Sequence, residues 1–297
     1  MNNKALCIFI FIFLFTVQSF AQSEAQLLIS DMKRLRMEMI NAKDVNRLRL
    51  LNDTFSLAVE DFLNTENSFY TQLDSVPFLG DLYSPDGAFR IINWNIPVDD
   101  GFYKYFAYLQ THNKKKKTSE IFRLNDRSDS YDRPEHKTMD ADSWFGALYY
   151  QIIPYEVDKK QEYALLGWDG ANPMLNIKVI EVMYFGRNGE PRFGATRFKP
   201  GKRMQRRVLF KYAQDASMSL RYHPKKDMII FDHLVPMKQG MEGIYEFYGP
   251  DFTYDAFELS RKGKWEFVEN VDVRQPKNDK DWNTPTRKNL PNDSKKN

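Results

Sequence analysis

Four polar residues near the C-terminal end of the sequence have the side chains that acid–base chemistry requires. Asp232 and His233 end an apolar run, and Asp251 and Asp255 flank a short aromatic segment. An imidazole oriented by a carboxylate is a common general base. Adjacent residues of a strand point to opposite faces, so Asp232 cannot orient His233 directly. We therefore expect the partner of His233 to be Asp251 or Asp255.

A structural role is the more common explanation for such residues. Asp232 would then cap a turn, and His233 would bond a backbone carbonyl at a strand end. Asp251 and Asp255 could hold Ca²⁺ with backbone carbonyls and water, but the sequence around them lacks the Asp/Asn/Gly ladder of calcium loops. Asx turns explain both aspartates without a metal. The sequence therefore favours no metal and no cofactor.

Aromatic residues form a second set of candidates. The chain contains 23 Phe, 16 Tyr and 5 Trp. Rings exposed on strands can bind carbohydrate, and Trp94, Trp144 and Trp168 are candidates for such a platform. In a chain this rich in aromatic residues, most strand rings belong to the core, so burial of these tryptophans is the alternative.

Other function classes receive little support. The sequence has no Gly-x-Ser-x-Gly motif, no His-Glu-x-x-His motif and no P-loop. The net charge is only +3, and the segment 276–297 supplies six Lys/Arg against three Asp. Because the rest of the chain is close to neutral, we expect no nucleic-acid partner.

The N-terminus is typical of a secretory signal peptide over residues 1–21. Lys4 gives a basic start, the run 5–17 is apolar, and Ser19-Phe-Ala21 suits cleavage before Gln22. The apolar run is short for a membrane span, so we expect none after cleavage. Cys7 is the only cysteine, so the exported chain would have no disulfide. We expect a periplasmic or extracellular location.

The remaining chain divides into three parts. Residues 22–75 predict a helical hairpin, with a break at 41–44 and Asp44 as the N-cap of the second helix. This hairpin packs on the rest of the protein or, alternatively, forms a coiled-coil arm. Residues 76–275 predict an antiparallel meander of about eleven strands, closed as two layers, a barrel or a propeller. Residues 276–297 predict a disordered tail.

Several connections have recognisable turn chemistry. Ser84-Pro-Asp-Gly87 and Trp168-Asp-Gly170 predict turns, and Arg187-Asn-Gly189 predicts a hairpin. In this interpretation Asp169 has only a turn role. The polar stretch 126–142 predicts an exposed loop.

Several strings together resemble a group of exported proteins of Bacteroidota-type bacteria that have no known activity. They are SPDGAFRIINWNIP, YALLGWDG, RRVLFKYAQDASMSLRY, MIIFDHLVP and YGPDFTYDAFELSRKGKWEF, within residues 84–274. The resemblance implies export and a bacterial source, and it implies no activity and no catalytic residues.

Two functions remain after this reasoning. The first is a non-enzymatic exported protein with a binding or cell-envelope role, whose partner is an envelope ligand or protein. The second is a hydrolase that acts on an envelope polymer or glycan through His233 and the carboxylates of Asp232, Asp251 or Asp255. A docking role for the helical hairpin is a third possibility.

Overall fold

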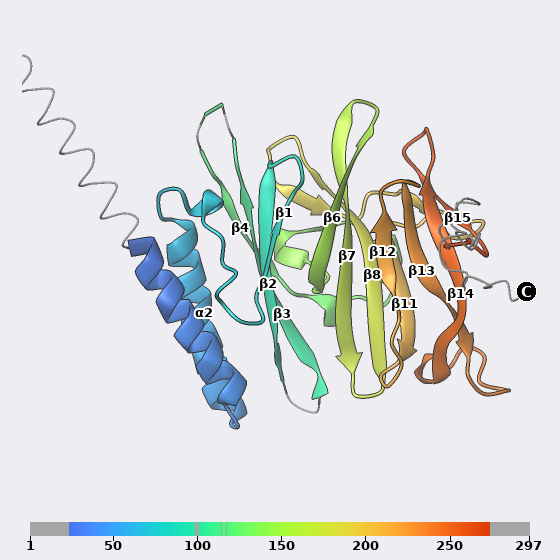
Figure 1. Ribbon diagram of the computed structural model, residues 1–297, viewed down its shortest axis with the longest axis horizontal. Coiled ribbons are helices and arrows are strands. Elements are labelled where there is room, and N and C mark those ends of the chain that lie inside the picture. Colours follow the sequence, from blue (N-terminus) through green and yellow to red (C-terminus); the bar gives the residue numbers. More distant parts are fainter. Residues whose placement is uncertain (1–23, 99–100, 114, 117, 274–297) are drawn as a thin grey trace, which may run out of the picture.

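The computed structural model describes residues 24–98, 101–113, 115–116 and 118–273. Two N-terminal helices and three sheets follow one another along the long axis of the molecule (Figure 1). The prediction of a mainly β protein with an N-terminal α-hairpin is confirmed. The predicted signal peptide (1–21) and the predicted tail (276–297) lie outside the described residues. No helix in the described part of the chain is long and apolar enough to cross a membrane.

The two helices pack on the first sheet. The first spans residues 24–41 and the second, α2, spans Val45–Leu63. Asp44 caps α2 as predicted, because its side chain accepts a hydrogen bond from the backbone N–H of Arg47. The apolar face of α2 is buried against the sheet through Phe55, Val59 and Phe62. The hairpin therefore uses its apolar stripe inside the protein, as expected for a packed hairpin and not for a free coiled-coil arm.

The first sheet is a four-stranded antiparallel meander. Its strands, in spatial order, are β1 (Gly80–Tyr83), β2 (Phe89–Pro97), β3 (Tyr103–Thr111) and β4 (Ile121–Asn125).

The second sheet has six strands. Its order is β5 (Met139–Asp140), β9 (Pro191–Phe193), β8 (Leu175–Phe185), β7 (Lys160–Asn172) and β6 (Leu148–Val157). The sixth strand, β11 (Arg207–Ala213), pairs with residues 175–181 of β8, whereas β9 pairs with residues 183–185.

The third sheet has five strands. Its order is β10 (Phe198–Lys199), β15 (Trp265–Val268), β14 (Tyr248–Leu259), β13 (Met228–Pro236) and β12 (Leu220–His223). The β10–β15 pair is parallel, and the other described strand pairs are antiparallel. Short 3₁₀ helices occur at η1 (Ser68–Tyr70), η3 (Ser128–Ser130), η4 (Pro134–His136), η5 (Ala141–Ser143) and η6 (Tyr245–Phe247).

Alternation along the inner strands explains how the layers stack. Side chains of successive strand residues point to opposite faces. In β2, Ile91 faces the second sheet and Ile92 faces the helices. In β7, Leu165 faces the first sheet and Leu166 faces the third. Both faces of these strands are buried, and apolar residues therefore occur at adjacent positions, as in Ile91-Ile92 and in Leu165-Leu166.

The predicted closure of the sheet is wrong. The described residues form fifteen strands in three stacked sheets, where the sequence suggested about eleven in two layers, a barrel or a propeller. No closed barrel or propeller occurs among these strands. The strand pattern could not decide this, because each of those architectures has the same alternation of buried and outward residues.

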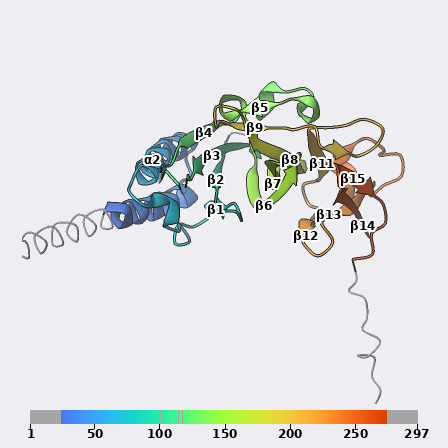
Figure 2. The same cartoon turned by 90° about the horizontal axis from the view of Figure 1, so that it is seen from above.

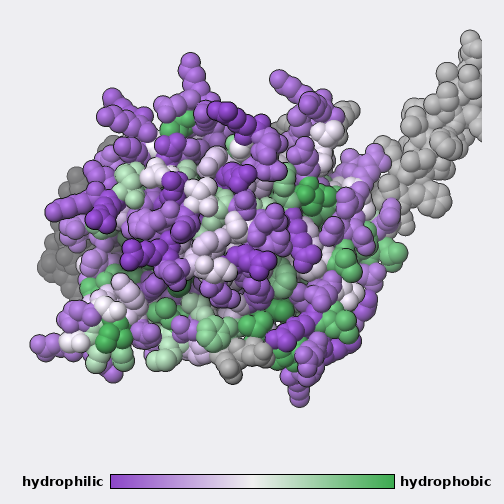
Figure 3. Space-filling model, turned by 180° about the vertical axis from the view of Figure 1, so that it is seen from behind, coloured by the Kyte–Doolittle hydropathy of each residue, from purple (hydrophilic) through white to green (hydrophobic). Residues whose placement is uncertain are grey.

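Two predicted connections also differ. The hairpin at 187–189 forms as expected between β8 and β9, but 168–170 lies inside β7 and is not a turn. The stretch 126–142 is not a simple exposed loop. It contains η3, η4, β5 and η5 and lies along one side of the first two sheets (Figure 2), with Pro134 and Met139 buried. The side of the molecule opposite that of Figure 1 is mostly hydrophilic, with smaller apolar patches (Figure 3).

Candidate functional site

His233 is oriented by a buried carboxylate. Its Nδ1 lies 2.6 Å from Oδ2 of Asp255, whose other oxygen accepts a hydrogen bond from the backbone N–H of Asn270. Asp255 is 4% exposed, whereas the His233 side chain is 44% exposed. The prediction that His233 takes its partner from the 251–255 segment is confirmed. The alternative, a bond from His233 to a backbone carbonyl, is not what forms.

A bulge in the β13–β14 pairing presents the imidazole. The register shifts between Asp232 and Leu234, so His233 lies opposite residues 251–253 of β14. Phe252, within this bulge, has φ of +69° and is 90% exposed. A β-bulge bends its strand and redirects side chains, which explains why His233 and Asp255 meet.

The other two aspartates of the predicted set have structural roles. Oδ2 of Asp232 accepts the backbone N–H of Ser219 at 2.7 Å, so it binds the chain next to its own strand. Oδ1 of Asp251 accepts both the N–H and the hydroxyl of Thr253, which is an Asx-type turn. The predicted Asx turn is therefore confirmed for Asp251, whereas Asp232 binds the neighbouring segment at Ser219 instead of capping a turn. Asp255 instead forms the hydrogen bond to His233.

Local hydrogen bonds shift the pKa values of His233 and Asp251. The bond to Asp255 raises the pKa of His233 above its ordinary value of 6.5, and the nearby carboxylates of Asp251 and Glu269 act in the same direction. The hydrogen bonds from Thr253 lower the pKa of Asp251. Since the folded pKa of His233 exceeds the unfolded one, the pair stabilises the fold below about pH 6.5. This contribution is lost as the pH rises through the folded pKa.

We expect Asp255→Asn to lower the pKa of His233 toward its ordinary value, because the substitution removes the charge that favours imidazolium. A proton–nitrogen NMR titration of the imidazole measures this pKa directly. Asp232→Asn is the matched control, since Asp232 bonds Ser219 and not His233. A wild-type pKa at or below 6.5, or the same shift in both variants, would contradict the assignment.

The proposed aromatic platform does not form. Trp94 and Trp144 are both 0% exposed, so neither ring can meet a ligand at the surface. Trp94 packs between the helices and the first sheet, and Trp144 lies between the first two sheets. Trp168 is half-buried, and its ring lies 5.8 Å from that of Tyr103. Of the three tryptophans, only Trp168 is therefore close to accessible space.

Tyr103, the neighbour of Trp168, lines a cleft between the first and second sheets, which we call the inter-sheet cleft. Its volume is about 620 Å³, and its walls come from β3, from the 128–135 segment and from the strands β7, β8 and β11. Small-molecule sites in proteins are clefts of this size with mostly aromatic walls and a few polar groups. Here the aromatic lining is Phe102, Tyr103, Tyr105, Tyr131 and Phe145.

Asp169 is the buried polar group of this cleft. Asp169 is 7% exposed, and its Oδ1 accepts a hydrogen bond of 2.8 Å from the hydroxyl of Tyr105. The same hydroxyl accepts the N–H of Gly170 at 2.8 Å, so its orientation is fixed. Burial raises the pKa of Asp169 to about 6, and the charges of Asp126 and Asp129 add to the shift. Perturbed carboxyls in clefts are typical of functional sites.

Asp126 positions the wall that carries Tyr105. Its carboxylate accepts the backbone N–H of Tyr105 at 3.1 Å and both the N–H and hydroxyl of Ser128. Lys104 donates to the backbone oxygen of Asp126 at 2.9 Å. Gly146 has φ of +80° and a Cβ there would collide with the Asp126 side chain, so only glycine fits at this position. These contacts tie β3 to the start of the 128–135 segment.

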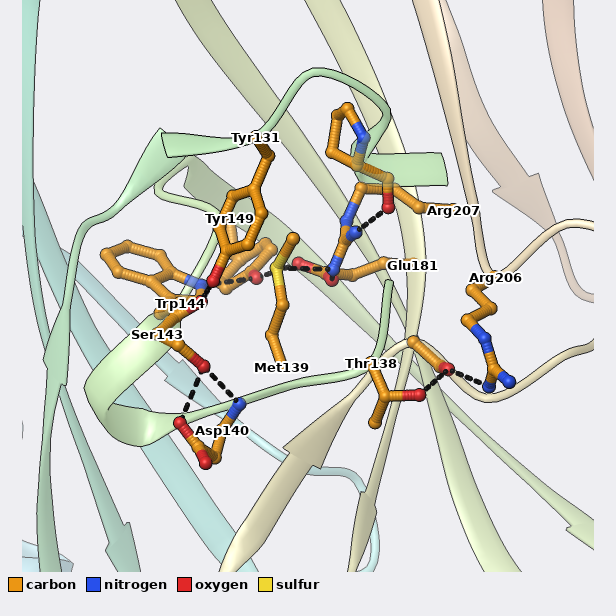
Figure 4. A network of polar contacts seen from close by, with 12 residues as sticks. Tyr131, Thr138, Met139, Asp140, Ser143, Trp144, Tyr149, Glu181, Arg206 and Arg207 are labelled. Carbon is orange, nitrogen blue, oxygen red and sulfur yellow. Dashed lines mark hydrogen bonds and ion pairs between the residues drawn. The ribbon is translucent and has the colours of Figure 1, made fainter. Parts of the chain in front are cut away.

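A buried polar network supports the other end of the 128–135 segment (Figure 4). Arg207 forms an ion pair with Glu181, with its Nε 2.9 Å from Oε2, and both side chains are 0% exposed. Glu181 also accepts the hydroxyl of Tyr149. Arg207 donates to the backbone oxygen of Pro134 at 2.6 Å and lies 5.1 Å from the ring centroid of Phe145. Because Pro134 and Phe145 line the cleft, this network holds its wall in place.

Sequence reasoning missed both Asp169 and this network. Asp169 precedes Gly170 after a tryptophan, which is the pattern of a turn, and no local signal indicates that its strand continues. Tyr105 and Asp169 are 64 residues apart, so only tertiary packing brings them together.

The described residues contain no group of three or more His, Cys, Asp or Glu side chains placed to hold a metal ion. No family model, curated protein or solved structure matches the chain. The function must therefore be inferred from the geometry of the two sites, the His233–Asp255 pair and the inter-sheet cleft.

Proposed function

We propose that this chain is an exported protein of the bacterial cell envelope that binds a small ligand and does not transform it. The signal-like segment 1–21, together with the resemblance to exported Bacteroidota-type proteins, supports the location. The observation that carries the binding role is the inter-sheet cleft, in which a buried carboxyl group, Asp169, is surrounded by aromatic walls.

The construction of the cleft favours binding over catalysis. Asp169 and Tyr105, at its centre, lie on strands of two packed sheets, which hold side chains more rigidly than loops do. The Tyr105 hydroxyl already donates to Asp169 and accepts from Gly170, so it is not free to transfer a proton to a substrate. Such preorganisation reduces the entropy that is lost when a ligand binds.

A variant that fills the cleft tests this function. Ala171 lines the cleft, and Ala171→Trp should occupy the ligand volume. The native mass spectrum of wild-type protein, incubated with a small-molecule extract of the envelope fraction, should show an added ligand mass that the variant lacks. Leu57→Trp is the control, because Leu57 is 62% exposed on α2, outside the cleft. Absence of any added mass, or its retention in Ala171→Trp, would count against the proposal.

Hydrolysis of an envelope polymer or glycan is the second candidate function. The observation in its favour is the 2.6 Å contact between His233 and the buried Asp255, because a carboxylate that fixes Nδ1 leaves Nε2 to act as a base. None of the three cavities described for this chain is lined by His233, and no hydroxyl or thiol nucleophile bonds it among the described residues.

The two functions differ in the effect of His233→Gln. For a hydrolase of this kind, release of new reducing ends or amino groups from purified envelope polymer should fall by about 10²-fold or more. For the binding protein, wild type and His233→Gln should both release none, and both should keep the ligand mass seen by native mass spectrometry.

A further inference from the structure

We propose that the inter-sheet cleft binds a small organic cation, an amine whose ammonium group contacts Asp169 and whose apolar part lies against Tyr103 and Tyr131. This inference rests on the binding function proposed above and adds the chemical class of the ligand.

One oxygen of Asp169 lacks a partner. Oδ1 accepts the Tyr105 hydroxyl, whereas Oδ2 has no hydrogen-bond donor and no ion-pair partner in the part of the chain that the structure describes. Asp169 is nevertheless only 7% exposed, and it lines the cleft. A buried charged group without a counter-charge is costly, so an unpaired carboxylate facing a cavity indicates a ligand that donates hydrogen bonds and carries positive charge.

The basic side chains of the cleft are engaged elsewhere. Lys104 donates to the backbone oxygen of Asp126 and lies 3.5 Å from its carboxylate. Lys211 lies over the ring of Tyr245, 5.7 Å from its centroid. Arg49 also has an interaction partner. No cation of the described protein therefore neutralises Asp169.

The remaining charges of the lining are negative. Asp129, Asp132 and Glu135 face the cleft from the 128–135 segment. Together with Asp169 they outnumber the three basic side chains of the lining, of which Lys104 is paired with Asp126. The lining is therefore acidic on balance, which favours a cation over a phosphate or carboxylate ligand.

Aromatic rings complete a cation site. Tyr103 is 39% exposed, and its ring packs against Trp168, the residue before Asp169. Phe102 and Tyr131 contribute further rings to the lining. The face of an aromatic ring attracts organic cations, and desolvation in a cleft strengthens this attraction. A buried carboxylate beside several rings is thus suited to an amine, whereas a neutral sugar would use the rings but leave the negative charge without a counter-charge.

Calorimetric titration with benzylamine and with its neutral isostere benzyl alcohol tests the inference. Wild-type protein should bind benzylamine about tenfold more tightly than benzyl alcohol, the difference expected for a charge-assisted hydrogen bond. Asp169→Asn should bind the two compounds equally. This variant keeps an acceptor for Tyr105 and removes only the charge.

Asp86→Asn is the matched control. Asp86 also accepts a tyrosine hydroxyl, from Tyr163 at 2.7 Å, but it does not line the inter-sheet cleft. The Asp86→Asn variant should therefore still bind benzylamine more tightly than benzyl alcohol. The wild-type comparison of the two compounds needs no variant, so it remains decisive even if Asp169→Asn folds poorly.

Equal affinity of wild-type protein for both compounds would overturn the proposal that the ligand is a cation, and would leave the cleft as a site for neutral ligands. Failure of both to bind at millimolar concentration would also overturn it. Neither result decides the general binding function, which the Ala171→Trp experiment addresses separately.

Discussion

Replacing Arg207 with methionine should lower the free energy of unfolding by about 3–5 kcal/mol. The substitution leaves the Glu181 carboxylate in a fully buried position with only the Tyr149 hydroxyl as a partner. It also removes the donor to the backbone oxygen of Pro134, which fixes the wall of the inter-sheet cleft. Urea denaturation followed by circular dichroism measures the change, provided that the slope of the transition stays constant.

Two further variants show whether the loss comes from the uncompensated charge. Arg207→Met combined with Glu181→Gln removes both charges while keeping an acceptor for Tyr149, so it should recover a substantial part of the stability. Arg206→Met is the matched control at the neighbouring position. Arg206 donates to the backbone oxygen of Gly194 at 3.0 Å and is only part-buried, so we expect a loss of about 1 kcal/mol. A loss of that small size for Arg207→Met would refute the role of the buried pair.

Trp94→Ala should be comparably destabilising, with a loss of about 3–5 kcal/mol. Trp94 is 0% exposed, and its ring meets that of Phe55 edge-on at 5.0 Å and stacks on Phe106 at 5.6 Å. Its Nε1 donates to Oδ1 of Asn52 at 2.8 Å, so truncation also leaves the buried Asn52 oxygen without its donor. The ring therefore attaches α2 to the first sheet.

Limited proteolysis adds a local measurement for this variant. Loss of the Trp94 anchor should expose residues 24–63 to cleavage before the rest of the chain. Leu57→Ala, on the exposed side of α2, should change stability by no more than about 0.5 kcal/mol. If Trp94→Ala were as stable as Leu57→Ala but lost affinity for carbohydrate, the ring would be a binding platform and not a core residue.

The N-terminal hairpin was predictable because its signals are local. A stripe of apolar residues with a period of 3.6 indicates an amphipathic helix, and Asp44 before that stripe indicates an N-cap. The structure confirms both features. The strands β2 and β7 were likewise visible as short segments rich in aromatic and aliphatic residues. The sheet that each strand joins could not be predicted, because the same alternation of buried and outward residues is compatible with a barrel, a propeller or stacked sheets.

The partner of His233 could be narrowed to two residues from the sequence. The opposite orientation of adjacent strand residues excluded Asp232, and the nearby 251–255 segment offered Asp251 and Asp255. The choice between these two needed the structure, since the bulge at residues 251–253 sets which carboxylate reaches Nδ1. Register at a bulge depends on the neighbouring strands, which no short segment encodes.

The inter-sheet cleft depended entirely on tertiary structure. Its central contact joins Tyr105 to Asp169, and its supporting ion pair joins Glu181 to Arg207, so every pair spans residues distant in sequence. By itself, the sequence determined the types of element, the absence of common catalytic motifs and the signal-like N-terminus. Only the packing of the helices and the three sheets on one another decided that Trp94 is buried and that Asp169, in the pattern of an ordinary turn, lies in a cleft. The physical reason is that burial and long-range pairing arise from the packed fold as a whole, whereas propensity and periodicity act within a few residues.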